Sequence, residues 1–510
     1  MLHAAGAGQW RAAISLRRGA ATLPLVIVVA TLLRGWLLAS NHPLHHDEAL
    51  YGYWAQLIAS GRDPFLLTAW VDKPPLVIYL AAVSLRLFGV SEWALRLPGM
   101  IASLATIVCV YGLSRRLYDA RTAFLASVLL ALSPFAILFA PTIFTDPWLT
   151  LWLTAAAWAA VSRRDFVAGI AVGLAVASKQ QGVLVAALVI ALLVGEAVAS
   201  AQRPARVLLP ILGRLGPALL GFALVFAPLT WWDSLRWSNR PSFWDRSLTT
   251  YGGLGLAPLS TWPDRAADWG RIFGYLFGAA GLTVVMLGLA LAAAFHDRRR
   301  VTIRVMAAFL LGYLALHFLA TFQPWDRYLL PILPLLCLLA ARGVDLWHHG
   351  RLTPRLKPAR RAVGIGLVLL LSWAAWLGVT ARLPVGSDHG AYAGLDRIAA
   401  FLRSQEPDAI IYHRWLGWHY DFYLFDAPQE RRWWGAAWKL ADDAGRTQQE
   451  TPARTQWLVL PGWRDVAAGD VRLALASRGL GLIEAMRVYR SDGSRAFTVY
   501  RIVPEVVHRG

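Results

Sequence analysis

Residues 20–51 read AATLPLVIVVATLLRGWLLASNHPLHHDEALY. The first part, residues 20–39, is a predominantly apolar run close to the ~20 residues that a helix needs to span a bilayer. It is too long for the apolar core of a signal peptide, and many further apolar runs follow it. Arg11, Arg17 and Arg18 precede the run, and basic residues gather on the cytoplasmic side of membrane proteins. We therefore expect a first transmembrane helix with a cytoplasmic N-terminus and a polar, acidic segment beyond its outer end.

The composition of the whole chain agrees with this expectation. The 510 residues are 57% hydrophobic and 16% charged, whereas soluble domains are roughly 45–50% apolar and about 25% charged. Nearly all of the formal net charge of +19 lies before residue 383, in short arginine-bearing loops. Because no basic stripe with interleaved aromatics occurs, we expect no nucleic-acid partner. The two cysteines, Cys109 and Cys337, form neither a disulfide framework nor a zinc-ligand pattern.

The positions of the arginine loops predict the topology. Basic residues cluster at 115–121, 163–164, 203–214, 298–304 and 342–361, which we expect to be cytoplasmic. The run at residues 76–90 is too short for a span, and we expect an interfacial or re-entrant helix there. About 11 spans then remain, near residues 20–39, 94–113, 122–140, 148–162, 166–179, 183–199, 212–232, 271–295, 305–322, 328–343 and 362–382.

This topology predicts the domain organisation. Residues 1–382 form an all-α polytopic membrane domain in the plasma (inner) membrane, with outer loops at 40–93 and 233–270. Residues 383–510 form a small extracytoplasmic α/β domain. Its expected strands are 409–413, 456–460, 482–489 and 496–502, with a helix at 466–477. The aromatic segment 412–420 (YHRWLGWHY) is open to two interpretations, an acceptor-facing platform or a packed turn from strand to helix.

Charged residues stand beside the spans in the outer loops, where such residues are costly and usually functional. The first group is His45-His46-Asp47-Glu48-Ala49-Leu50-Tyr51. Asp47 could cap a helix that begins there, or this group could supply ligands to a divalent metal ion. The second group is Asp72-Lys73-Pro74-Pro75-Leu76, in which Lys73 could instead only reach toward lipid headgroups.

Two further groups follow at the outer ends of later spans. Phe144-Thr145-Asp146-Pro147-Trp148 forms a tight turn, and Asp326-Arg327-Tyr328-Leu329-Leu330-Pro331 places Arg327 at the start of a span. Lys179 lies at another outer helix end. Two acids, Asp47 and Asp146, thus share one membrane face with several cations. Such a set suits group transfer from a membrane-anchored phosphate, because a carboxylate can deprotonate an acceptor while cations stabilise the departing phosphate.

These motifs, with the run SEWALRLP at residues 91–98, occur in the order typical of a known family. Over about residues 20–345 the chain resembles the polytopic glycosyltransferases of the C-type (GT-C) fold, in the protein mannosyltransferase and aminoarabinose transferase (ArnT-like) superfamily. Protein mannosyltransferases usually have His-Pro-Pro where this chain has Lys73-Pro74-Pro75, so the aminoarabinose transferase branch is more similar. That branch commonly has Glu before the lysine, where Asp72 stands here.

The resemblance implies both an activity and roles for residues. It implies an undecaprenyl-type polyprenyl-phosphate sugar donor and a lipid, glycan or protein acceptor in the cell envelope. Asp47 resembles the family's general base, Asp146 its second-loop acid and Lys73 its phosphate-contacting lysine. The remaining candidate substrate-binding residues are Glu48, Tyr51, Asp72, Lys179, Arg327 and Tyr328. We expect transfer with inversion; the alternatives are a transporter or flippase, or a scaffold protein.

Overall fold

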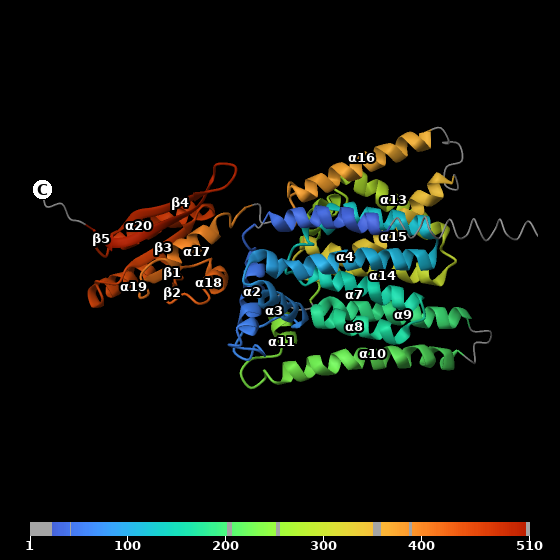
Figure 1. Cartoon of the computed structure of the whole chain (residues 1–510), viewed down its shortest axis with the longest axis horizontal. Helices are drawn as coiled ribbons and strands as arrows, with labels where there is room; N and C mark the ends of the chain where they lie inside the picture. The colour runs from blue at the N-terminus through green and yellow to red at the C-terminus, as the bar shows by residue number, and fades with distance from the viewer. Residues whose placement is uncertain are drawn as a thin grey trace, which may run out of the picture. The chain divides into compact units, whose positions relative to one another are not determined.

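The computed structural model describes residues 23–40, 42–200, 207–250, 255–349, 359–386 and 390–505. The chain divides into two compact units (Figure 1). The first comprises Met1–Ser40 and Leu57–Gly386, and the second comprises Asn41–Gln56 and Ser387–Gly510. Helix α2 (His46–Ala59) therefore begins among the residues of the second unit and ends among those of the first.

The first unit is built from helices that run alongside one another in a bundle (Figure 1). Its first described helix is Leu23–Ala39. The helices that follow are α3 (Leu76–Phe88), α4 (Glu92–Leu117), α5 (Ala120–Leu132), α6 (Pro134–Leu138), α7 (Asp146–Val161), α8 (Asp165–Ser178), α9 (Val183–Ser200), α10 (Leu208–Ser234), α11 (Phe243–Thr250), α12 (Trp262–Gly274), α13 (Ala280–His296), α14 (Val301–Leu319), α15 (Leu333–His348) and α16 (Ala359–Val379). Among the residues that the structure describes, three 3-10 segments join them: η1 (Gln180–Gly182), η3 (Leu259–Thr261) and η4 (Asp326–Ile332).

The apolar character of this bundle confirms a polytopic membrane fold. Within the described residues, six helical segments are long and apolar enough to cross a membrane, and shorter apolar helices accompany them. The predicted count of about 11 spans stays a prediction. The run at residues 76–90 does form a short helix, α3.

Two of the predicted spans are interrupted, for local physical reasons. The predicted span 122–140 is divided between α5 and α6 at Ser133 and Pro134, because proline has no backbone N–H to continue the helical hydrogen bonds. The predicted span 271–295 is broken between α12 and α13, where Gly278 has φ +96°. A Cβ added at Gly278 would lie 2.5 Å from the Cβ of Ala374, so close packing also requires glycine at this break.

A buried arginine satisfies the helix end that Pro134 leaves open. Arg34, in the helix Leu23–Ala39, is fully buried. Its guanidinium donates to the carbonyl oxygens of Ala131 (3.0 Å) and Leu130 (3.3 Å), and to the hydroxyl of Ser103 (2.9 Å). The last carbonyls of a helix have no partner within the helix, so Arg34 serves as the C-terminal cap of α5.

The second unit contains a five-stranded sheet in the order β2-β1-β3-β5-β4. The strands are β1 (Ile410–His413), β2 (Glu430–Trp433), β3 (Gln456–Pro461), β4 (Leu480–Tyr489) and β5 (Arg495–Pro504). Strand β1 is parallel to β2 and β3, whereas β5 is antiparallel to β3 and β4. The helices are α17 (Leu395–Arg403), α18 (Gly417–Tyr423), α19 (Ala437–Glu450) and α20 (Asp465–Ala476), with the 3-10 segment η6 (Gly462–Arg464).

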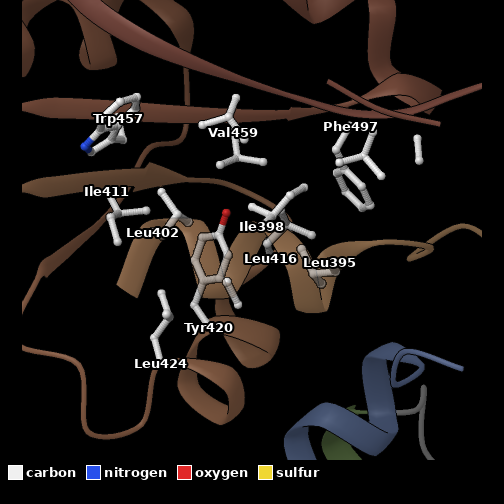
Figure 2. Packing of buried hydrophobic residues seen from close by; sticks show 14 of the residues in the cluster. Leu395, Ile398, Leu402, Ile411, Leu416, Tyr420, Leu424, Trp457, Val459 and Phe497 are labelled. Atoms are coloured by element: carbon white, nitrogen blue, oxygen red, sulfur yellow. The ribbon is translucent and has the colours of Figure 1, made fainter. Parts of the chain in front are cut away.

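Alternating side chains of the sheet make two apolar cores. Ile411 and Val459 pack with residues of α17 and α18 on one face (Figure 2). Leu458 and Leu460 pack with residues of α19 and α20 on the other face. Successive residues of a strand point to opposite faces, so the sheet is covered on both sides. This confirms the predicted C-terminal α/β fold.

Candidate active site

A buried ion pair joins the start of α7 to the end of α8. The Nζ atom of Lys179 lies 2.6 Å from Oδ1 of Asp146, and both residues are buried. Asp146 is the first residue of α7, where the helix dipole favours a negative charge. Lys179 also lies over the ring of Tyr328, 4.6 Å from its centroid. Buried charges are stable only when they are paired in this way, so each of these residues depends on the other.

A second ion pair precedes α3. The Nζ atom of Lys73 lies 2.7 Å from Oδ2 of Asp72, and both side chains are buried. Pro74 and Pro75 follow, and the residue before a proline is held in an extended conformation. Nε2 of Gln180 donates to the backbone carbonyl of Asp72 over 2.6 Å. Because Gln180 follows Lys179 directly, this bond ties the two lysine-bearing segments together.

Arg327 is held by aromatic rings and by its own backbone. Its guanidinium lies 4.8 Å from the ring centroid of Phe144 and 5.3 Å from that of Trp325. The Asp326 carboxylate accepts the backbone N–H groups of Arg327 and Gly386, each over 2.7 Å. Asp326 therefore fixes the turn at which Arg327 stands, and the two rings flank the guanidinium.

These elements together make a group of cations around one acid. Lys73 and Arg327 both repel the ammonium of Lys179 electrostatically, while Asp146 attracts it. The structure thus brings together five of the predicted site residues and places Tyr328 against one of them. We call Asp72, Lys73, Asp146, Lys179 and Arg327 the cation cluster. Closely spaced cations favour the binding of an anion such as a phosphate.

A polar chain that none of the sequence motifs indicated lies next to this cluster. Nε2 of Gln181 and Nε2 of His317 lie 2.9 Å apart, and Nδ1 of His317 lies 2.8 Å from the carbonyl of Tyr313. The hydroxyl of Tyr313 donates to the carbonyl of Tyr328 over 2.8 Å. A neutral His317 with its proton on Nδ1 satisfies both of its contacts. The signal for His317 was an ionisable residue within the apolar run 305–322, a position that usually has a function.

Three predicted residues lie on α2 in the second unit: Asp47, Glu48 and Tyr51. The Glu48 carboxylate accepts the backbone N–H of His45 over 3.1 Å, and Nδ1 of His45 accepts the backbone N–H of Asp47 over 3.2 Å. His45 and Glu48 thus form a reciprocal cap of the kind known as a capping box. The cap that the sequence suggested for Asp47 is therefore supplied by its neighbours. Tyr51 is buried and stacks on Trp54.

The four adjacent residues His45, His46, Asp47 and Glu48 do not make a metal site. Within the described ranges, no group of three or more His, Cys, Asp or Glu side chains is arranged to hold a metal ion. His45 and Glu48 are instead engaged in the cap of α2.

Comparisons with known proteins bear on the fold and on the segment that carries most of the cation cluster. Residues 72–232, which contain four members of the cation cluster, match the family model described as dolichyl-phosphate-mannose-protein mannosyltransferase. The structure of ArnT from Cupriavidus metallidurans bound to undecaprenyl phosphate superposes with a TM-score of 0.66, covering 96% of this chain and 98% of that one at 16% identity. The chain has the GT-C fold. The oligosaccharyltransferase AglB of Archaeoglobus fulgidus, in complex with an inhibitory peptide and a dolichol-phosphate, covers 94% of this chain and 74% of that one, with a TM-score of 0.56 at 14% identity.

Curated relatives match over shorter stretches. YkcB of Bacillus subtilis, whose name marks it as an unproven mannosyltransferase, is 31% identical over 88 residues. That alignment spans 17% of this chain and 12% of the relative's length. A further structure of the Archaeoglobus oligosaccharyltransferase is a complex with zinc and sulfate. The predicted fold is thus confirmed over nearly the whole chain. The mannosyltransferase family match covers residues 72–232, which hold every member of the cation cluster except Arg327.

Proposed function

We propose that this chain is an integral-membrane glycosyltransferase that transfers a sugar from a polyprenyl-phosphate donor to an acceptor hydroxyl. The observation that carries the proposal is the cation cluster, which lies in a fold shared with ArnT bound to undecaprenyl phosphate. Three cations around a buried acid suit a donor whose leaving group is a phosphate. The acceptor is a lipid, a glycan or a protein.

The reaction proceeds by a single displacement. The Asp47 carboxylate takes the proton of the acceptor hydroxyl, and the acceptor oxygen forms a bond to the anomeric carbon. The bond between that carbon and the phosphate oxygen breaks, and its electron pair leaves with the polyprenyl phosphate. Lys73 and Arg327 stabilise the negative charge that develops on this phosphate. One displacement inverts the configuration at the anomeric carbon.

Other candidate residues hold the reacting groups in place. Asp146 orients the sugar or the acceptor, and Lys179 holds the Asp146 carboxylate in place through their ion pair. Asp72 directs Lys73, and Tyr328 contacts Lys179. Glu48 and Tyr51 set the N-terminal turns of α2, on which Asp47 stands.

The orientation in the membrane is part of the proposal. The basic loops face the cytoplasm, since Lys and Arg concentrate there. The loops 40–93 and 233–270 and residues 383–510 then lie outside the cytoplasm, where polyprenyl-phosphate sugars are presented to envelope acceptors. Residues 1–382 serve as the catalytic membrane domain, and residues 383–510 as a soluble domain.

The test is transfer from defined donors. Purified protein in lipid nanodiscs is incubated with undecaprenyl phosphate carrying radiolabelled mannose or aminoarabinose and with membrane acceptors. We expect labelled product with the opposite anomeric configuration, and a loss of about 10²- to 10⁴-fold in Asp47→Asn. Asp268→Asn, which removes only an exposed pair with Arg271, is the matched control and keeps full activity.

Two results would contradict the proposal. Retention of the anomeric configuration would exclude a single displacement, and near-normal turnover by Asp47→Asn would remove Asp47 from the role of base. Movement of the lipid-linked sugar across the membrane without its transfer would instead favour a flippase.

A further inference from the structure

Helix α18 has two faces with different partners. Leu416, Tyr420 and Leu424, spaced four residues apart, are almost fully buried in the core between α17 and the sheet (Figure 2). Residues at this spacing lie on the same side of a helix. The phenol ring of Tyr420 extends toward Ile398 and Leu402 in this core (Figure 2). α18 is therefore fixed to the C-terminal sheet through its apolar face.

The neighbouring face of α18 holds one residue of the segment that precedes α2. Nε2 of His419 lies 3.0 Å from the carbonyl oxygen of Leu44, and the backbone N–H of Leu44 donates to the hydroxyl of Tyr423 over 3.2 Å. Leu44 and His419 are both completely buried. The backbone N–H and the carbonyl of Leu44 are thus both hydrogen-bonded to side chains from one turn of α18.

The state of His419 suits this contact. Burial lowers the pKa of His419 to about 3, so the ring is neutral at physiological pH. A neutral ring that donates from Nε2 to the Leu44 carbonyl has its lone pair on Nδ1. That Nδ1 atom is buried without a hydrogen-bond partner among the described residues. A packing role alone would be served better by an apolar side chain, since a buried polar atom without a partner is costly.

Further contacts between α2 and the region of α18 continue along α2. Nε2 of Gln56 donates to the carbonyl of Phe422 over 3.3 Å. The rings of Tyr53 and Phe425 lie 6.1 Å apart in an edge-to-face arrangement. The contacts therefore begin just before α2 and continue to its third turn.

The restraint reaches Asp47 through a short path. Leu44 is bonded to His45, and His45 caps α2 by accepting the backbone N–H of Asp47. We propose that α18 is a positioning element for the catalytic carboxylate, with His419 and Tyr423 holding Leu44 and so fixing the N-terminal turn of α2. This gives residues 417–420, the part of the aromatic segment that lies in α18, a role that differs from an acceptor platform. The catalytic part of the inference rests on the proposed function, in which Asp47 is the base.

The first test separates positioning from stability by kinetics on the full-length protein in nanodiscs, with undecaprenyl phosphate mannose as donor probe. We expect His419→Leu to lower kcat about 10- to 100-fold with a nearly unchanged donor KM, because misplacement of a reacting group costs rate rather than binding. His419→Gln, whose Nε2 can donate to the same carbonyl, restores most of kcat. In the Asp47→Asn background, His419→Leu has no further effect on the residual rate.

A matched control exists in the same unit. Tyr412→Phe removes a hydroxyl that lies 2.9 Å from Asp443 and 3.2 Å from Gln456, and we expect it to lower thermal stability without lowering kcat. Tyr423→Phe removes the hydroxyl that accepts from Leu44, and we expect it to lower kcat. Equal kcat values in these two variants, or full kcat in His419→Leu, overturn the proposal.

The second test does not depend on catalysis. Hydrogen exchange measured by mass spectrometry on residues 42–49 should be at least about tenfold faster in His419→Leu than in the wild type and in Tyr412→Phe, because the Leu44 restraint is lost. Unchanged exchange overturns the positioning role. Faster exchange in a protein that shows no transfer supports the restraint and shows that the proposed function has failed instead.

Discussion

The two ends of α7 both hold buried charges, but they use them differently. The C-terminal end of α7 lies next to Asp165, the first residue of α8, and we call it the Asp165 end. There Arg214 donates to both oxygens of Asp165 (2.7 and 3.0 Å), to Glu196 (2.8 Å) and to the carbonyl of Ala160 (2.8 Å). At the Asp146 end, Lys179 donates to one carboxylate oxygen and is repelled by two other cations. A guanidinium that is saturated by bidentate contacts stabilises helix packing. The Lys179 ammonium, which lies among other cations, can still bind an anion.

The largest effect is expected when the acid of the cation cluster is removed. Asp146→Asn leaves Lys179 buried beside Lys73 and Arg327, so we expect a loss of about 3–5 kcal/mol in stability together with loss of transfer. Asp146→Asn combined with Lys179→Met should regain much of the stability but none of the activity. Thermal melting in detergent and the transfer assay measure the two effects. A double mutant that transfers sugar would show that the pair is structural, like the pair at the Asp165 end.

The Asp165 end should respond in the opposite way. Arg214→Met leaves Asp165 and Glu196 without their shared cation, and we expect a loss of stability of about 3 kcal/mol. The kcat of the folded fraction should stay within about twofold of the wild type, since these residues take no part in catalysis. Melting temperature and kcat per folded molecule are the measurements. A large fall in kcat with normal melting would break the contrast between the two ends.

The smallest effect concerns affinity for the lipid phosphate. Lys73→Gln should weaken the binding of undecaprenyl phosphate about tenfold, which corresponds to about 1.4 kcal/mol, whereas Lys73→Arg keeps the charge and most of the affinity. Titration calorimetry in detergent measures both variants. Raising the ionic strength should reduce the difference in affinity between Lys73→Arg and Lys73→Gln only modestly, because buried charges are poorly screened. Equal affinities for Lys73→Gln and the wild type would contradict a phosphate role for Lys73.

Periodicity and charge predicted most of the fold. Apolar runs near the span length located α4, α9 and α14 closely, and alternating apolar residues located β1, β3, β4 and β5. Strand β2, with the sequence ERRW, was missed because a polar edge strand has no alternating apolar pattern. The break at Ser133 and Pro134 shows why span lengths alone were insufficient, since a single proline divides a continuous apolar run.

The members of the cation cluster could be chosen from the sequence, but their pairing could not. Asp146 and Lys179 are 33 positions apart, and only tertiary packing brings them within 2.6 Å. A cap at Asp47 was one of the interpretations that the sequence left open, because Asp ranks highly among N-cap residues. The structure uses His45 and Glu48 instead, since a side chain three positions into the helix can reach back to the N-cap.

The cap that Arg34 provides for α5 has a consequence for biosynthesis. The guanidinium is made with the first described helix, but its acceptors at Ser103 and Ala131 lie 69 and 97 residues later in the chain. At about 5–20 residues per second, the ribosome needs several seconds to reach them. During that interval the nascent helix holds a charge that the bilayer tolerates poorly. We therefore expect its stable insertion to be completed only when α4 and α5 emerge, so that Arg34 would couple the order of translation to the assembly of the bundle.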